Sequence, residues 1–196
     1  IKNNLLLDKK YSPHKSFINN EIVPLSGGII FLLSICIFYP SEFYPFKLIL
    51  CIVFFIGIFS DLNIISSPSK RIIIQTLLIL AFLYINQTYI QSVRWIFLDY
   101  YLQNTIFGYL FSLFCLVILI NGVNFMDGVN TLVIGYFLIV ILTILHIATN
   151  FNLELNFMLI KIILITLSVI FLFNFFGKLF LGDSGSYLVA FILGYL

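Results

Sequence analysis

Charged side chains are scarce in this chain of 196 residues, because Asp, Glu, Lys and Arg together make up only 9% of it. A soluble domain carries charge on roughly a quarter of its residues. Hydrophobic residues make up 62% of the chain, and its mean hydropathy is +1.14. The composition therefore excludes an ordinary soluble protein and indicates an integral membrane protein. The net charge of +2 is also too small to indicate nucleic-acid binding.

Cysteine is rare as well, and its positions exclude two common uses. Cys36, Cys51 and Cys115 lie inside apolar runs without a CxxC spacing, so neither a disulfide framework nor a zinc site is indicated. No polar stretch is long enough for a separate soluble domain, so residues 1–196 are interpreted as a single membrane domain. Because the chain starts at Ile1 without a signal-peptide pattern and its last apolar run stops at Leu196, we expect a fragment of a longer protein.

The apolar runs predict an all-α fold, a polytopic transmembrane helix bundle with six full spans and the start of a seventh. A short hairpin at 41–45 and an interfacial helix within 91–105 are expected outside the hydrocarbon. The segment 1–25 is expected to be cytoplasmic. The predicted spans lie near 26–40, 46–60, 71–88, 105–124, 131–149, 157–175 and 186–196.

The distribution of basic residues predicts which side of the membrane each connection faces. Successive connections alternate between the two sides, and most Lys and Arg residues fall on the side that also holds the segment 1–25. The positive-inside rule makes that side cytoplasmic. Asp61, Asp127 and Asp183 all belong to it, so they can converge although they are far apart in sequence. Ionisable groups are costly near hydrocarbon, so these three acids are candidate functional residues.

The connection before the last apolar run reads Gly182-Asp183-Ser184-Gly185-Ser186. Small residues before a helix start leave backbone N–H groups free to bind a phosphate, and a carboxylate there can hold a hard cation. An ordinary helix cap by Asp183 or Ser186 explains the same residues. Both interpretations stay open on this motif alone.

Three polar residues, Asn121, Asn124 and Asp127, are spaced three apart where an apolar run ends. On a continuing helix they would share one face. Their oxygens suit magnesium, and their amides can bind a sugar or a base. A polar helix end that starts a turn is the alternative. A polar stripe in so apolar an element favours the functional interpretation.

The remaining cytoplasmic connections offer weaker candidates. Asp61 could act as a base or as a second cation-binding acid, and Lys70 with Arg71 could meet lipid or substrate phosphate. Basic residues at a helix end are also ordinary topology signals, and we favour that explanation for these two. Gly27 and Gly28 permit close approach of a lipid or of another backbone.

Four motifs occur in order on the predicted cytoplasmic side: PLSGG at 24–28, GIFSD at 57–61 followed by SPSKRIIIQ, NGVNFMDGVNTL at 121–132, and FLGDSGS at 180–186. Together they resemble the polyprenyl-phosphate N-acetylhexosamine-1-phosphate transferases (glycosyltransferase family 4), which are similar to the phospho-MurNAc-pentapeptide transferase. The resemblance implies Mg²⁺-dependent transfer of a sugar-1-phosphate from a UDP-N-acetyl sugar to undecaprenyl phosphate, with release of UMP. It also implies a multi-pass protein of the bacterial inner membrane that initiates cell-envelope glycan or O-antigen synthesis, with its active site on the cytoplasmic face. Whether it forms a homodimer is left open.

The resemblance also implies roles for single residues. Asp183 and Asn124 become the metal ligands, and Asp61 and Asp127 the catalytic acids. The residues assigned to substrate binding are Gly27, Gly28 and Asn124 from the resemblance, and Lys70, Asn121 and Ser186 from the loops themselves. Three positions depart from the family pattern: Ser60 stands where the first acid of an Asp-Asp pair is expected, Leu25 stands for an Arg, and Asn130-Thr131 stand for Asp-Gly.

Two other classes of protein are alternatives to the enzyme. A transporter also buries acids among helices, but it tends to place them near the bilayer midplane and to contain internal repeats. A non-catalytic scaffold in a glycan-assembly complex would explain Ser60 and Leu25.

Overall fold

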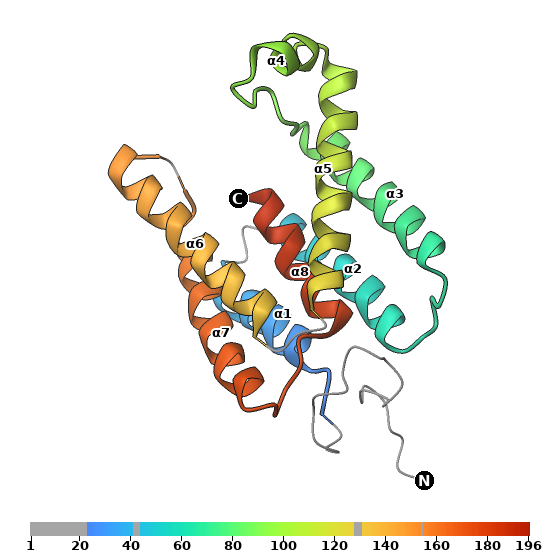
Figure 1. Ribbon diagram of the computed structural model, residues 1–196, viewed down its shortest axis with the longest axis vertical. Coiled ribbons are helices and arrows are strands. Elements are labelled where there is room, and N and C mark those ends of the chain that lie inside the picture. The colour runs from blue at the N-terminus through green and yellow to red at the C-terminus, as the bar shows by residue number, and fades with distance from the viewer. Residues whose placement is uncertain (1–22, 41–43, 128–130, 154) are drawn as a thin grey trace.

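The computed structural model describes residues 23–40, 44–127, 131–153 and 155–196, which form eight helices and no strand (Figure 1). The predicted all-α class is therefore confirmed. Most of the predicted segment 1–25 and of the predicted hairpin at 41–45 lies outside the described residues. The helices are α1 (Gly27–Phe38), α2 (Tyr44–Asp61), α3 (Pro68–Asn86), α4 (Ile96–Leu102), α5 (Thr105–Met126), α6 (Leu132–Phe151), α7 (Phe157–Phe175) and α8 (Gly182–Tyr195).

Five of these helices, α2, α3, α5, α6 and α7, are 18 to 22 residues long and apolar enough to cross a membrane. At 1.5 Å per residue, such lengths match a hydrocarbon core of about 30 Å. They correspond to five of the six predicted full spans, and they make the chain a multi-pass membrane protein. The side chains that they expose are largely apolar, as lipid contact requires.

Helix α1 is shorter than the full span predicted at 26–40. It has 12 residues, so it is about 18 Å long. Its C-cap, Tyr39, is extended, which is the conformation expected before a proline such as Pro40. The Lys47 ammonium then donates hydrogen bonds to the carbonyls of Cys36 and Tyr39, so α2 satisfies two carbonyls at the end of α1.

Helix α8 lies in the middle of the bundle, where it contacts α1, α2, α5 and α6 (Figure 1). Every residue from Ser184 to Ile192 is buried, which explains why this helix is apolar on all sides after its first turn. It begins at Gly182, earlier than the predicted start at 186. Gly182 has a φ of +74°, a conformation that glycine adopts without strain. Asp183 is consequently in the first turn of the helix.

Close packing around α8 depends on glycine. A Cβ placed on Gly57 of α2 would lie 2.2 Å from the Cα of Ser184, and one placed on Gly28 of α1 would lie 2.6 Å from the backbone nitrogen of Gly185. The backbone N–H groups of Gly27 and Gly28 also donate to the carbonyls of Phe180 and Leu181. The absence of these side chains lets three segments that are distant in sequence meet backbone to backbone.

Helix α4 falls inside the segment 91–105 predicted to be interfacial, and it lies at one end of the molecule (Figure 1). Asp99 accepts hydrogen bonds from the Ser92 hydroxyl and from the Val93 N–H, which folds the preceding loop onto the helix. Trp95 and Phe97 are exposed, as aromatic side chains at a membrane surface are expected to be.

Candidate active site

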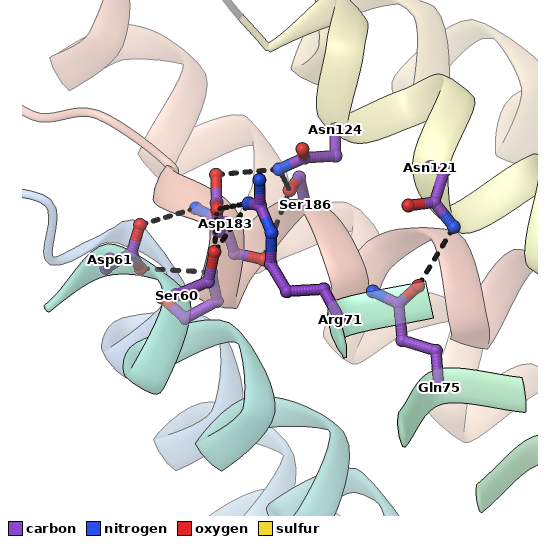
Figure 2. A network of polar contacts seen from close by, with 9 residues as sticks. Ser60, Asp61, Arg71, Gln75, Asn121, Asn124, Asp183 and Ser186 are labelled. Atoms are coloured by element: carbon purple, nitrogen blue, oxygen red, sulfur yellow. Dashed lines mark hydrogen bonds and ion pairs between the residues drawn. The ribbon is translucent and has the colours of Figure 1, made fainter. Parts of the chain in front are cut away.

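The ends of four helices meet around the side chain of Asp183 (Figure 2). Asp183 lies in the first turn of α8, Ser60 and Asp61 end α2, Arg71 lies in the first turn of α3, and Asn124 lies in the last turn of α5. These residues span most of the chain in sequence. Only the packing of the helices brings them together.

Both oxygens of the Asp183 carboxylate accept hydrogen bonds. Oδ2 accepts from the Ser60 hydroxyl at 2.5 Å and from Nη1 of Arg71 at 3.1 Å, and Oδ1 accepts from Nδ2 of Asn124 at 2.7 Å. Nη1 of Arg71 also donates to the Ser60 hydroxyl at 2.7 Å. The side chains of Arg71 and Asp183 are 23% and 28% exposed, so the ion pair is accessible from outside the protein.

The carboxylate of Asp61 binds the backbone of α8 and not the side chains of the cluster. Oδ1 accepts from the N–H of Asp183 at 2.8 Å, and Oδ2 accepts from the N–H of Ser184 at 3.1 Å. The first N–H groups of a helix have no partner within the helix. Asp61 therefore acts as an N-cap supplied by a neighbouring helix, and its negative charge matches the positive end of the helix dipole.

Ser186 is fully buried and supports the cluster from behind. Its hydroxyl accepts from Nδ2 of Asn124 at 3.2 Å and donates to the carbonyl of Asp183 at 3.1 Å. These bonds fix the carboxamide of Asn124 beside the carboxylate. Substrate contact by Ser186 stays a prediction, because the geometry shows a supporting role for this residue.

The polar residues predicted to share one face of α5 have different partners in the structure. Asn124 reaches Asp183, whereas Nδ2 of Asn121 donates to Oε1 of Gln75 at 2.9 Å, one turn further into the bundle (Figure 2). Asp127 is the C-cap of α5, and its backbone N–H binds the carbonyls of Val123 and Asn124. The structure thus brings Asn124 into the cluster and leaves the roles of Asn121 and Asp127 as predictions.

The other predicted substrate-binding residues lie outside the cluster. Gly27 and Gly28 are buried against the backbone of 180–185, where they provide room for close packing. Lys70 is exposed and makes no polar contact with the described residues. Whether these residues contact substrate stays a prediction.

Two members of the cluster, Ser60 and Arg71, were absent from the predicted site. The basic residues at this helix end favour a topology signal for Arg71, but Arg71 and Gln75 lie four residues apart and therefore share a face of α3. Lys70 precedes Arg71 by one residue, which turns it by about 100° around the helix. That spacing was the signal in the sequence for choosing Arg71 over Lys70.

The donor chemistry of the cluster fits a hard divalent cation. Within the described residues no group of three or more His, Cys, Asp or Glu side chains could hold a metal ion. Magnesium, however, usually binds one or two protein carboxylates and completes its shell with waters and substrate phosphates. The Asp183 carboxylate and the amide oxygen of Asn124 are oxygen ligands of this kind. In this structure Asn124 turns its amide nitrogen toward the carboxylate, so its carboxamide would have to rotate before its oxygen could join Asp183 at a metal ion.

The fold and the cluster define a multi-pass membrane protein with a charged site at the ends of its helices. The chain matches the family model for glycosyl transferase family 4 over residues 44–196, and it belongs to this family. The match includes every member of the Asp183 cluster, whereas the loop at 24–28 lies outside it. Comparison with curated proteins and with solved structures gives no significant match. Membership supports a glycosyl-1-phosphate transferase role, in agreement with the resemblance noted in the sequence.

Proposed function

We propose that this protein transfers N-acetylhexosamine-1-phosphate from a UDP-sugar to undecaprenyl phosphate and releases UMP, which initiates the assembly of a cell-envelope glycan such as O-antigen. The observation that carries this proposal is the Asp183 cluster. A carboxylate, a guanidinium and a carboxamide from three helices meet at the start of a buried helix. Such a site suits a bound diphosphate and its cation.

In the reaction, an oxygen of the lipid phosphate attacks the β-phosphorus of the UDP-sugar. A new phosphorus–oxygen bond forms as the bond to the UMP oxygen breaks. Catalysis of such a transfer depends mainly on positioning and on neutralising charge. Asp183 and Asn124 would hold Mg²⁺, which neutralises charge on the diphosphate. Arg71 supplies further positive charge at the same place.

The structure offers a simple role for Asp61 in this scheme. A phosphate monoester has a second pKa near 6, so the lipid phosphate is largely ionised at neutral pH. Its attack therefore needs little help from a base. By capping α8, Asp61 holds the turn that presents Asp183. This positioning role is sufficient to explain an acid at this place, and the role as a base is the competing hypothesis.

The proposed location is the inner membrane of a bacterium, with the cluster on the cytoplasmic face. Lys70, Arg71 and Lys178 are near the same helix ends as Asp183, as the positive-inside rule expects of a cytoplasmic side. The donor nucleotide is made in the cytoplasm, so this orientation also places the site where the donor is available.

Exchange of labelled UMP into UDP-GlcNAc, in membranes supplied with undecaprenyl phosphate, tests the enzyme directly. We expect Mg²⁺-dependent exchange, and we expect Asp183→Asn to abolish it. Asp99→Asn removes a carboxylate from α4, far from the cluster, and is the matched control. Near-normal turnover by Asp183→Asn would contradict the assignment of Asp183 as a metal ligand.

The same assay separates the enzyme from a non-catalytic scaffold. The scaffold is the second candidate because Ser60 replaces an acid that the family pattern expects. A scaffold would show no exchange in the unmodified protein. Exchange above that of membranes lacking the protein excludes this candidate, and it excludes a transporter as well.

A further inference from the structure

The Arg71 guanidinium forms an ion pair with the carboxylate that is proposed to hold a cation. Nη1 of Arg71 donates to Oδ2 of Asp183 at 3.1 Å, and the Ser60 hydroxyl donates to the same oxygen (Figure 2). Nη1 also donates to Ser60 at 2.7 Å, which closes a ring of three contacts. The ring links α2, α3 and α8 by their ends.

Few lone pairs of Asp183 remain for a metal ion. A carboxylate offers about four acceptor positions. In this structure Ser60 and Arg71 use positions on Oδ2, and Asn124 uses one on Oδ1. A positive charge at the distance of Arg71 also repels a second cation. A divalent cation therefore cannot bind both oxygens of Asp183 while these contacts persist.

Among the described residues, the hydrogen-bonding neighbours of Arg71 other than Asp183 leave it without a partner of opposite charge once Asp183 is engaged elsewhere. Ser60 is neutral, and both oxygens of Asp61 already accept backbone hydrogen bonds from α8. An acid at position 60 would have kept a negative charge beside the guanidinium. With Ser60 in that place, the described part of the chain offers a displaced Arg71 no free acid, so an anionic ligand is the group that can pair with it.

We propose that Arg71 is the resident counter-cation of Asp183, and that a divalent cation binds both oxygens of this carboxylate only in exchange for the guanidinium. The displaced guanidinium is then neutralised by the anionic ligand that accompanies the cation. Cation and anionic ligand consequently bind with positive coupling, and each binds weakly alone. The inference rests on the proposed function in one respect, which is the divalent cation at Asp183.

Titration with Mn²⁺ tests whether a divalent cation replaces Arg71 at Asp183. The titration uses the purified, ligand-free protein in detergent, and the electron paramagnetic resonance signal of the free ion measures how much Mn²⁺ is unbound. We expect Arg71→Gln to bind Mn²⁺ about tenfold more tightly than the unmodified protein, a change equivalent to about 1.4 kcal/mol. Lys178→Gln removes the same charge from an exposed side chain in the connection between α7 and α8, outside the cluster. We expect it to stay within about twofold of the unmodified protein.

A second variant keeps the test decisive if Arg71→Gln does not fold. Ser60→Ala removes one donor to Asp183 and one acceptor from Arg71, and it changes the volume of a buried site very little. We expect it to tighten Mn²⁺ binding about threefold. Size-exclusion chromatography identifies the variants that are folded and monodisperse.

The outcomes distinguish this inference from the proposed function. If Asp183→Asn abolishes Mn²⁺ binding but Arg71→Gln and Ser60→Ala bind no more tightly than the unmodified protein, the cation site stands and the exchange is overturned. If Asp183→Asn binds Mn²⁺ as the unmodified protein does, the cation is not at Asp183. That result contradicts both the metal assignment and the replacement of Arg71 by a cation.

Discussion

The carboxylate of Asp61 caps the helix that carries Asp183, because its Oδ1 accepts the backbone N–H of Asp183 at 2.8 Å. The second oxygen accepts the N–H of Ser184. The last residue of α2 thus fixes the first turn of α8. Asp61, which the sequence suggests as a catalytic acid, therefore supports the turn that carries Asp183, which the sequence suggests as a metal ligand.

Asp61→Ala should lower both stability and activity. The substitution leaves two N–H groups of α8 without acceptors, and losing such a cap costs about 0.5–2 kcal/mol. Asp61→Asn retains one acceptor oxygen and should fall between Asp61→Ala and the unmodified protein. Unfolding in mixed micelles and UMP exchange measure the two effects. Equal stability of all three proteins would contradict the capping role.

The pH dependence of UMP exchange distinguishes a capping role of Asp61 from base catalysis. If Asp61 acts through the position of α8, Asp61→Asn keeps the shape of the pH–rate profile and lowers its plateau. A base would instead give a limb of the profile that disappears in Asp61→Asn. Loss of that limb would restore the competing hypothesis.

Gly57→Ala should disrupt the contact between α2 and α8. The added Cβ would lie 2.2 Å from the Cα of Ser184, and a backbone atom cannot move aside as a side chain can. Overpacking of this kind typically costs about 1–3 kcal/mol. We expect a lower midpoint of thermal unfolding and a loss of exchange. Gly122→Ala is the control, since a Cβ at that position meets nothing within 4 Å. If both variants behave alike, close packing at Gly57 is not needed.

The Asn121–Gln75 hydrogen bond should contribute to stability between α3 and α5. Gln75 is buried, and its Nε2 has no hydrogen-bond partner among the described residues. Its Oε1 accepts a hydrogen bond from Nδ2 of Asn121. Interhelical hydrogen bonds in membranes contribute about 0.6 kcal/mol on average and up to about 1.7. Asn121→Leu should cost an amount in this range.

A double-mutant cycle with Gln75→Leu measures the coupling between these two residues. We expect the double variant to be less destabilised than the sum of the single variants. We also expect Asn121→Leu to leave the KM for the UDP-sugar unchanged. A raised KM at unchanged stability would instead support the predicted substrate contact of Asn121.

Ser60→Asp should make the protein more dependent on a divalent cation. Because the Ser60 hydroxyl lies 2.5 Å from Oδ2 of Asp183, an acid at this position would place two carboxylates together. The variant should melt at a lower temperature without Mg²⁺ and gain more from added Mg²⁺ than the unmodified protein does. Ser66→Asp adds the same charge in the exposed loop after α2 and should not show this gain. An equal response of both variants would contradict the prediction.

The sequence predicted the helical membrane fold and the loops that carry the site, and it did so from local signals. The length of an apolar run decides whether a helix can cross the bilayer, and the five long helices agree with the predicted runs. The exception is α1, which Pro40 limits to 12 residues. The Gly182–Ser186 motif similarly identified the start of α8, although the helix begins earlier than predicted.

The partners of the site residues were less accessible from the sequence. Hydropathy does not report how each helix is rotated about its axis, and this rotation decides that Arg71 joins the cluster while Lys70 faces outward. Along α5, the three-residue spacing of the polar positions does not reveal that Asn124 contacts Asp183 whereas Asn121 contacts Gln75. Ser60 was noted as a departure from a pattern, but its hydrogen bonds to Arg71 and Asp183 depend on the approach of α2 to α8.

The sequence by itself determined that this is a membrane-embedded bundle of the glycosyl transferase family 4, because apolar length and motif order are properties of consecutive residues. The tertiary structure decided what each polar group does. Gly57 and Gly28 let α8 lie against α2 and α1, and this close approach turns Asp61 into a cap. It also gives Asp183 a guanidinium from α3, because a hydrogen bond or an ion pair forms only where packing brings its two partners within about 3 Å.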